Sequence, residues 1–341
     1  MSKIQTICLF FTFFNFYAAA HSEWTRIYKQ IFDCKKYTTK QIFIKNQHSS
    51  FLFSQLVFSW NAQRPPQGFF RFSVRVRTAQ TQKWSRWHTM IEWGAHIQRS
   101  FHSKSKRGTK YNYVRLETGK HIADLFEIRV EACDGASLCF LKFTAITISN
   151  LKKFSSEHVT KEHRLLKSII IQGVPRRSQI PFEKNGERVL CSPTSLSMLA
   201  EYLCKKPINL PLFAQNVYDN GLRIYGSWPF NTAHAYEKCD NKAYFYVTRL
   251  SSFKELHKLL LQRIPIVVSI RGFVRGAPKA YPSGHLLLVI GYDAHRQLVI
   301  CHDPAQKQKR VLSRYTLTDF LAAWDRSYRL AYIASPIGSL L

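Results

Sequence analysis

Residues 70–77 read FRFSVRVR and alternate between apolar and polar side chains at every step. Phenylalanine and valine share one face of an extended chain, and mainly arginine occupies the other. This period of two is typical of a β-strand with one buried face. Further strand-like runs follow without helical periods between them, at 51–53, 56–58, 111–116, 125–132 and 138–148. The sequence therefore predicts an antiparallel β-sandwich over residues 21–150.

A polar, charged stretch at 151–167 leads into a region of mixed pattern. Pro193 suits the first turn of a helix whose leucines follow at helical spacing. Ser252 and Glu255 form a capping-box pattern before a second helix. The remaining segments are expected strands at 264–270, 286–292, 298–301 and 330–334, and a helix at 316–324. A chain of 341 residues suits two domains, so we expect residues 168–341 to form a separate α+β domain.

The first twenty residues have the three parts of an export signal. Lys3 supplies the positive start, residues 4–17 a short apolar core, and residues 18–20 a small-residue cleavage site. The apolar core is shorter than the roughly 20 residues that span a bilayer, and no later stretch is long and apolar enough. We expect a secreted or periplasmic protein without a transmembrane segment in its mature chain.

Eight cysteines become seven if Cys8 leaves with the signal. An odd number outside the cytosol leaves one thiol over, which suits a catalytic cysteine. Cys133 and Cys139 bracket an Asp-Gly turn and are one candidate disulfide. Cys204 and Cys239 are a second candidate, although spacing alone does not fix the connectivity.

The formal net charge of +29 predicts attraction to anionic partners such as envelope or cell-surface polymers. No nucleic-acid recognition motif is present, so no specific nucleic-acid partner is predicted. Trp84, Trp87 and Trp93 are spaced like a carbohydrate platform, but packing in the core or on a strand surface is the preferred interpretation. His158 and His163 do not share a helical face, so we predict no metal site and no cofactor.

Three segments carry residues suited to nucleophilic catalysis. Cys191 stands directly before the predicted helix, where the positive end of the helix dipole favours a thiolate. His285 opens an apolar strand, and Asp303 ends the next strand. The turn at 293–297 would bring these two side by side, as base and orienting carboxylate. Each residue alone fits a structural role, but their joint occurrence in the order Cys, His, Asp favours a catalytic triad.

Four separated motifs in order resemble cysteine peptidase family thirty-nine, the bacteriocin-processing group of the papain-like clan. They are SQ at 178–179, CSPTS at 191–195, GHLLLVIGY at 284–292 and DPA at 303–305. The similarity is greatest to the stand-alone branch of this family, extends through YGSWPFNTA at 225–233, and spans about residues 168–336. The N-terminal region resembles the accessory module that precedes such domains in some bacterial proteins. The resemblance implies a papain-like cysteine peptidase domain behind the sandwich.

The resemblance also implies roles for individual residues. Gln179 matches the glutamine that donates a hydrogen bond to the oxyanion. Ser192 replaces a glycine that many members carry, and it is expected to border the substrate together with Trp228 and Gly284.

The implied function is hydrolysis of peptide or protein substrates through an acyl-enzyme. A peptidoglycan amidase or acyltransferase would use the same triad. A third class is a non-catalytic binding or adhesion protein on the same scaffold, which the intact set of four catalytic candidates argues against.

Overall fold

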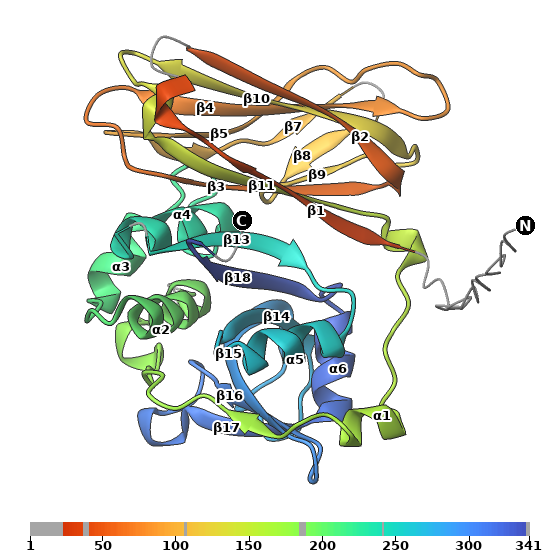
Figure 1. Ribbon diagram of the computed structural model, residues 1–341, viewed down its shortest axis with the longest axis vertical. Helices are drawn as coiled ribbons and strands as arrows, with labels where there is room; N and C mark the ends of the chain where they lie inside the picture. The colour runs from red at the N-terminus through yellow and green to blue at the C-terminus, as the bar shows by residue number, and fades with distance from the viewer. Residues whose placement is uncertain (1–22, 37–40, 106–107, 184–188, 241, 339–341) are drawn as a thin grey trace, which may run out of the picture.

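The computed structural model describes residues 23–36, 41–105, 108–183, 189–240 and 242–338 (Figure 1). The predicted export signal, including Cys8, lies outside the described residues. An N-terminal pair of sheets lies over a second body of one sheet and several helices (Figure 1). The predicted class, an antiparallel sandwich followed by an α+β domain, is confirmed. Among the described helices, none has the length and apolar character needed to cross a membrane.

The N-terminal body is built from two antiparallel sheets, in the orders β1-β11-β3-β9-β8-β7 and β2-β10-β4-β5-β6. Their strands are β1 (Thr25–Ile31), β2 (Ile42–Phe53), β3 (Gln55–Ala62), β4 (Phe69–Thr78), β5 (His88–Gly94), β6 (Gln98–Ser100), β7 (Ser103–Lys104), β8 (Lys110–Asn112), β9 (Arg115–Glu117), β10 (Ala123–Cys133) and β11 (Leu141–Ser149). The apolar residues of 70–77 are completely buried, as the alternating pattern predicts. Phe72 of β4 packs on Trp60 of β3, with ring centroids 4.7 Å apart, so the core lies between the two sheets.

One strand prediction in this region is wrong. Residues 111–116 form a hairpin, with β8 and β9 joined by Tyr113 and Val114. Both joining residues have left-handed φ angles, 45° and 56°. This conformation is the one required by a two-residue hairpin turn, in which glycine or asparagine usually occupies the two central positions. Neither is present, so the sequence gives no turn signal.

The tryptophans of the suspected carbohydrate platform are covered by arginine side chains. The Arg75 guanidinium lies 4.6 Å from the Trp84 ring centroid and 4.8 Å from that of Trp87. Arg129 covers Trp87 as well, at 4.6 Å, and Trp93 is buried in the core. Trp84 and Trp87 therefore pack on the strand surface through cation–π contacts, and Trp93 packs in the core.

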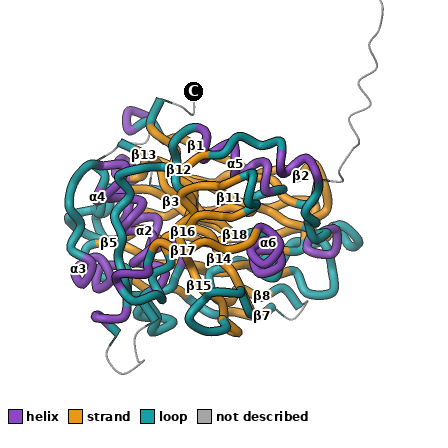
Figure 2. Tube along the Cα trace, turned by 90° about the horizontal axis from the view of Figure 1, so that it is seen from below, coloured by secondary structure: helices purple, strands orange, loops and turns teal. Residues whose placement is uncertain are grey.

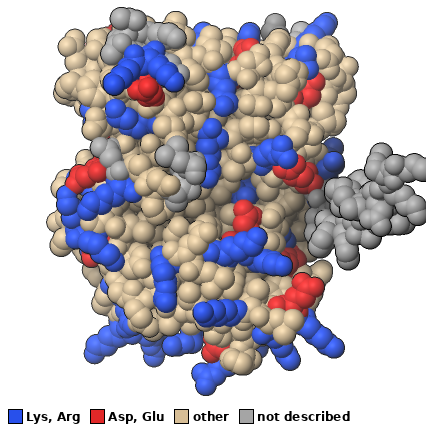
Figure 3. Space-filling view, viewed as in Figure 1, with Lys and Arg blue, Asp and Glu red and all other residues tan. Residues whose placement is uncertain are grey.

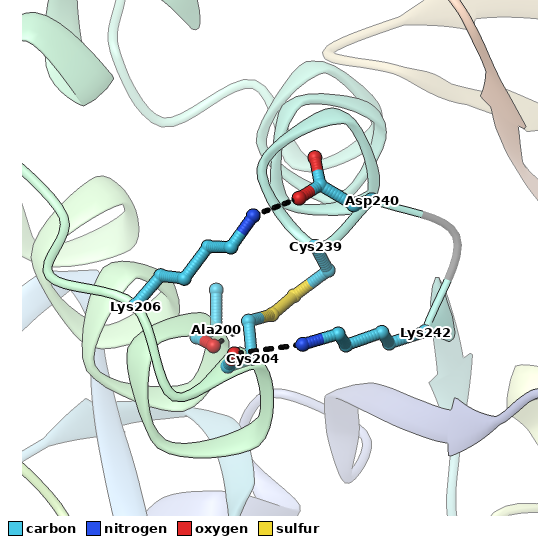
Figure 4. The surroundings of a disulfide bond; sticks show 6 residues. All are labelled: Ala200, Cys204, Lys206, Cys239, Asp240 and Lys242. Atoms are coloured by element: carbon cyan, nitrogen blue, oxygen red, sulfur yellow. Dashed lines mark hydrogen bonds and ion pairs between the residues drawn. A yellow bond between two sulfur atoms is a disulfide. The ribbon is translucent and has the colours of Figure 1, made fainter.

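The disulfides differ in part from the predicted pairs. Cys34 bonds to Cys139, joining the short helices η1 (Cys34–Lys36) and η2 (Leu138–Phe140), and Cys133 is free. The predicted Cys133–Cys139 bond is therefore wrong. The Cys204–Cys239 bond is confirmed; it ties the ends of two helices beside the Lys206–Asp240 ion pair (Figure 4).

Three cysteines are free in the described part of the chain, Cys133, Cys191 and Cys301, so more than one thiol is left over.

The C-terminal body has one antiparallel sheet in the order β13-β18-β14-β15-β16-β17, with β12 pairing beside β15. Its strands are β12 (Ile169–Ile170), β13 (Ala243–Arg249), β14 (Ile266–Gly272), β15 (Tyr281–Asp293), β16 (Leu298–His302), β17 (Leu312–Thr316) and β18 (Leu330–Pro336). Its helices are α2 (Cys191–Cys204), α3 (Leu210–Asn216), α4 (Trp228–Lys238), α5 (Phe253–Leu261) and α6 (Leu317–Asp325). Helices α2, α3 and α4 gather at one side of the sheet and α6 at the other (Figures 1 and 2). The Ser252 side chain caps α5 by accepting from Glu255 N, as the capping pattern predicts.

The stretch at 151–167 connects the two bodies and contains the short helices η3 (Leu151–Lys153) and α1 (Lys161–Arg164). His163 is buried and contacts Glu157 at 3.2 Å, whereas His158 is exposed. The described residues contain no cluster of three or more His, Cys, Asp or Glu placed to hold a metal ion.

Side chains of the N-terminal body complete the edge of the C-terminal sheet. Asn61 donates to Phe245 O and accepts from Phe245 N, each at 2.8 Å. Ser59 accepts from Val247 N at 3.2 Å, and Thr147 donates to Val247 O at 3.2 Å. These groups lie on the edge of β13 that faces β3 and β11 (Figure 1). The sandwich therefore covers a strand edge that would otherwise stay unpaired.

Candidate active site

Cys191 is the first residue of α2, a helix of 14 residues. Leu190 is its N-cap, and Thr194 N donates to Leu190 O at 3.0 Å. Pro193 fits the first turn because its missing N–H would have no partner there. Cys191 as a residue is 7% exposed, and its thiol belongs to the positive end of the helix.

His285 lies on β15, directly beside the start of α2. Ser195 Oγ of the helix donates to Leu286 O of the strand at 2.9 Å, which fixes helix and strand at this point. His285 is almost completely buried, and the Cys191 side chain is among the neighbouring groups that raise the pKa of His285. The structure thus brings together two residues that lie 94 positions apart in the sequence (285 − 191).

Asp303 follows the end of β16 and completes the arrangement. Its Oδ1 accepts from His285 Nε2 at 2.7 Å and from Ala305 N at 2.9 Å. Its Oδ2 accepts from Tyr315 OH at 2.6 Å and from Tyr281 OH at 3.2 Å. The carboxylate is fully buried, and these four donors replace the water that it gives up. Because Nε2 of His285 is occupied, Nδ1 is the ring nitrogen left for Cys191.

The positive charge of His285 and the negative charge of Asp303 stabilise each other. Burial lowers the pKa of His285, but the charge and hydrogen bond of Asp303, together with Cys191, raise it to about 10. Burial raises the pKa of Asp303, yet the imidazolium and the surrounding donors hold that pKa below its usual value. The site therefore favours a charged imidazolium against a charged carboxylate.

Two tyrosines around Asp303 were not foreseen from the sequence. The Tyr281 ring stacks on the His285 ring, with centroids 4.1 Å apart and planes 14° apart. Tyr315 lies on β17 and is buried. Burial and the adjacent Asp303 raise the pKa of both phenols far above the usual value. They stay protonated and act as hydrogen-bond donors to the carboxylate. One lies before the histidine and the other after the aspartate, on separate strands, so no local motif marks them.

Gln179 is buried near the same helix start. Its backbone N–H donates to Pro304 O at 2.9 Å, which ties it to the segment carrying Asp303. Its side-chain Nε2 donates to Glu183 Oε1 at 2.6 Å, and that oxygen also accepts from Leu190 N at 3.3 Å. The side-chain Oε1 is buried without a partner in the described structure. Glu183 is a further residue that sequence reasoning missed.

The three residues expected to border the substrate lie in different surroundings. Ser192 is fully buried, and its hydroxyl lies 3.0 Å from Tyr332 OH, between helix and sheet. Trp228 begins α4 and is half-buried. Gly284 directly precedes His285 and has a φ of +96°, which a residue with a Cβ rarely adopts.

A pocket lies beside Leu190, on the side of Gln179. Its volume is about 230 Å³. The lining is mostly apolar and comes from Pro181, Phe182, Leu190, Pro211, Ala214, Gln215 and Tyr225. One lining residue, Leu190, directly precedes Cys191 in the sequence, and the catalytic candidates themselves do not line the pocket.

Comparisons with known proteins cover both bodies. Residues 171–332 match the Peptidase_C39 like family, and residues 20–130 match the Peptidase C39 N-terminal domain. The solved structure of xylellain, a cysteine protease from Xylella fastidiosa, is 13% identical, with a TM-score of 0.35 over 53% of this chain and 91% of that chain. A TM-score of this size does not establish a common fold. The similarity of this chain to C39-like peptidases therefore rests on the two family matches. No curated protein matches the chain.

Proposed function

We propose that this chain is an exported cysteine peptidase that hydrolyses peptide bonds through Cys191, His285 and Asp303. The matches of residues 171–332 to the Peptidase_C39 like family and of residues 20–130 to the Peptidase C39 N-terminal domain support this proposal. The observation that carries the proposal is the buried chain of contacts from Cys191 through His285 to Asp303, with 2.7 Å between Nε2 and Oδ1. A helix N-terminus beneath the sulfur and a carboxylate behind the imidazole are what a thiolate–imidazolium pair requires.

In this mechanism the Cys191 thiolate attacks the substrate carbonyl and forms a tetrahedral intermediate. The His285 imidazolium gives its Nδ1 proton to the leaving amine, and a thioester remains on Cys191. The neutral His285 then takes a proton from water, which attacks the thioester and releases the acid product. Asp303 keeps the ring in the tautomer that carries hydrogen on Nε2.

Gln179 serves as an oxyanion donor in this proposal, together with the backbone N–H of Cys191. The amide of Gln179 has two N–H bonds, and Glu183 occupies one of them. The second remains for the oxyanion. The apolar pocket beside Leu190 would receive a hydrophobic side chain of the substrate.

Export and domain division form part of the same proposal. Residues 1–20 act as a signal peptide that is removed, residues 21–150 as an accessory domain, and 151–167 as the linker before the peptidase domain. Two disulfides in the described chain, Cys34–Cys139 and Cys204–Cys239, support an oxidising compartment. The excess of positive charge supports contact with anionic polymers of the cell envelope.

The test compares the secreted wild type with Cys191→Ala on peptide libraries and on cell-wall fragments. Cleavage of peptides by the wild type alone supports the peptidase, and a covalent adduct of Cys191 with a thiol-directed probe supports the nucleophile. Release of cell-wall fragments without peptide cleavage would instead identify an amidase. A wild type that reacts with neither substrate and binds no probe would be a binding protein.

A further inference from the structure

Three loops form one rim at the end of the molecule where the triad lies. They are residues 174–179, which carry Gln179, residues 273–281, which end in Tyr281, and residues 303–310, which begin with Asp303. Hydrogen bonds hold them together: Gln306 Nε2 donates to Gly276 O at 3.1 Å, and Gln308 Oε1 accepts from Ser178 N at 3.0 Å. The rim is therefore a fixed border of the catalytic residues.

The rim carries unneutralised positive charge. Its six exposed cations are Arg176, Arg275, Lys279, Lys307, Lys309 and Arg310. None of them forms an ion pair with a described residue. The one acidic residue in these three loops is Asp303, and it is buried against His285. Figure 3 shows Lys and Arg atoms along the lower edge of the molecule, the end at which β16 and β17 lie in Figure 1.

Several arginines on strands of the N-terminal body are, in contrast, neutralised by acidic residues. Arg71 and Arg99 both pair with Glu92, Arg75 pairs with Glu127, and Arg77 pairs with Asp124. Compared with these strands, the rim places six cations without an acidic partner among the described residues in three adjoining loops that also carry Gln179 and Asp303. Clefts bordered by one sign of charge raise the local concentration of oppositely charged substrates.

We propose that this rim binds an acidic segment of the peptide substrate, flanking the bond that Cys191 attacks. The proposal rests on the proposed function. An acidic peptide is favoured over an envelope polymer because the rim borders the triad itself. A surface anchor placed here would cover the triad.

Binding is measured with the inactive Cys191→Ala protein, by fluorescence anisotropy of a labelled peptide containing a run of glutamates. A peptide with lysines at the same positions is the matched ligand. We expect the acidic peptide to bind at least about tenfold more tightly, with an affinity that falls as salt is added.

The rim variant Lys307→Glu/Lys309→Glu/Arg310→Glu should lose at least about tenfold in affinity for the acidic peptide. The control Lys36→Glu/Lys152→Glu/Lys153→Glu makes the same change of charge at exposed residues of η1 and η3, and it should change the affinity less than about twofold. An equal loss of affinity in both variants would show that only the net charge of the protein matters, and it would overturn the proposal. So would rim-dependent binding of an anionic polysaccharide with no preference for the acidic peptide. Since the protein tested is inactive, this result is independent of whether Cys191 hydrolyses peptides.

A separate observation concerns the hydrogen bond between Gln179 and Glu183. A carboxylate can only accept hydrogen bonds, so Glu183 forces the NH₂ group of Gln179, and not its oxygen, to face it. The same carboxylate oxygen is held by Leu190 N, one residue before Cys191. Glu183 thereby links the orientation of the Gln179 amide to the backbone at the start of α2.

We propose that Glu183 is a positioning residue that keeps the Gln179 amide in the orientation needed to donate to the oxyanion. The terminal torsion of glutamine is broad and roughly two-fold, so the amide turns over easily without a partner that fixes it. Turned over, Gln179 would present an oxygen to the developing negative charge. This proposal also rests on the oxyanion role proposed for Gln179.

A double-mutant cycle tests the coupling. Glu183→Ala should lower kcat about tenfold or more with little change in KM, because an oxyanion donor acts in the transition state. In the Gln179→Ala background the same change should have almost no further effect. Glu183→Gln keeps an acceptor oxygen and should restore much of the activity.

Equal losses in both backgrounds would show that Glu183 acts by another route. A higher kcat in Glu183→Ala would show that the carboxylate obstructs the site. Either result overturns the proposal. A Gln179→Ala protein with unchanged kcat would refute the oxyanion role itself, a failure of the proposed function that is distinct from these.

Discussion

Replacing Asp303 by asparagine separates the charge of this residue from its shape. The two carboxylate oxygens have different partners. Oδ1 faces His285 Nε2 and Ala305 N, while Oδ2 faces the hydroxyls of Tyr315 and Tyr281. Asparagine fills the same space but offers one oxygen and one NH₂ group, so its orientation decides what happens to the imidazole.

The surroundings determine that orientation. The N–H of Ala305 can only donate, so the asparagine oxygen must face it, and His285 lies on the same side. The tyrosine hydroxyls can rotate and accept from the NH₂ group. His285 therefore keeps hydrogen on Nε2 and its Nδ1 toward Cys191. The variant loses the charge of Asp303 and retains the tautomer.

The expected loss in kcat/KM is about ten- to a hundredfold. In serine peptidases the equivalent change costs about ten-thousand-fold because it stabilises the wrong tautomer. The pH profile should also move. Asp303 is a main cause of the raised pKa of His285, about 10, and burial lowers that pKa once the charge is gone. Since the imidazolium is present only below this pKa, the alkaline limb should shift to lower pH by at least about one unit.

The assay is kcat/KM between acid and alkaline pH on a peptide that the wild type cleaves. Tyr315→Phe is the control, because it removes one hydrogen bond to the carboxylate but keeps the charge. Its alkaline limb should stay close to that of the wild type. An unshifted limb in Asp303→Asn would show that the carboxylate charge does not support the imidazolium. A loss near ten-thousand-fold would show that the tautomer is not held by Ala305.

Three further outcomes are expected. Cys191→Ala should abolish turnover, and peptide mapping after iodoacetamide should show Cys191 modified well before the buried Cys301. Gln179→Ala should lower kcat by roughly a hundredfold with little change in KM, measured by steady-state kinetics. Asn61→Ala should lower the free energy of unfolding in urea by about 3 kcal/mol, since it leaves buried N–H and C=O groups of Phe245 unpaired.

Local patterns in the sequence predicted the elements that depend on nearby residues. The alternation at 70–77 identifies β4, and Ser252 with Glu255 identifies the start of α5. The short turn between β15 and β16 predicted that these two strands pair side by side and antiparallel, as they do. That pairing is what places His285 beside Asp303. These relations follow from spacings of a few residues, which a sequence displays directly.

Features that depend on distant segments were not predictable in this way. The partner of Cys139 is Cys34, at a separation of 105 residues, although Cys133 is much nearer in sequence. Tyr281 and Tyr315 surround Asp303 only because β15 and β17 lie on either side of β16. Glu183 reaches Gln179 through a tight turn that has no distinctive motif. Each of these contacts is a consequence of the folded sheet and of the approach of loops at its edge.

The N-terminal body also contacts the C-terminal body away from the edge of β13. Asp219, in the loop between α3 and α4, is fully buried and accepts from Ser100 N of β6 at 2.9 Å. Gly221 lies so close to Ser100 O that a Cβ at this position would overlap it. This docking fixes the loop that continues to Tyr225, which lines the pocket beside Leu190.

A wall of the pocket is thus held by contacts with the sandwich, and the edge strand β13 is completed by the same body. Separating the two bodies would expose a strand edge and release the loop that shapes the pocket. The sandwich is therefore part of the framework around this pocket, whereas the contacts of His285 and Asp303 lie within the C-terminal body.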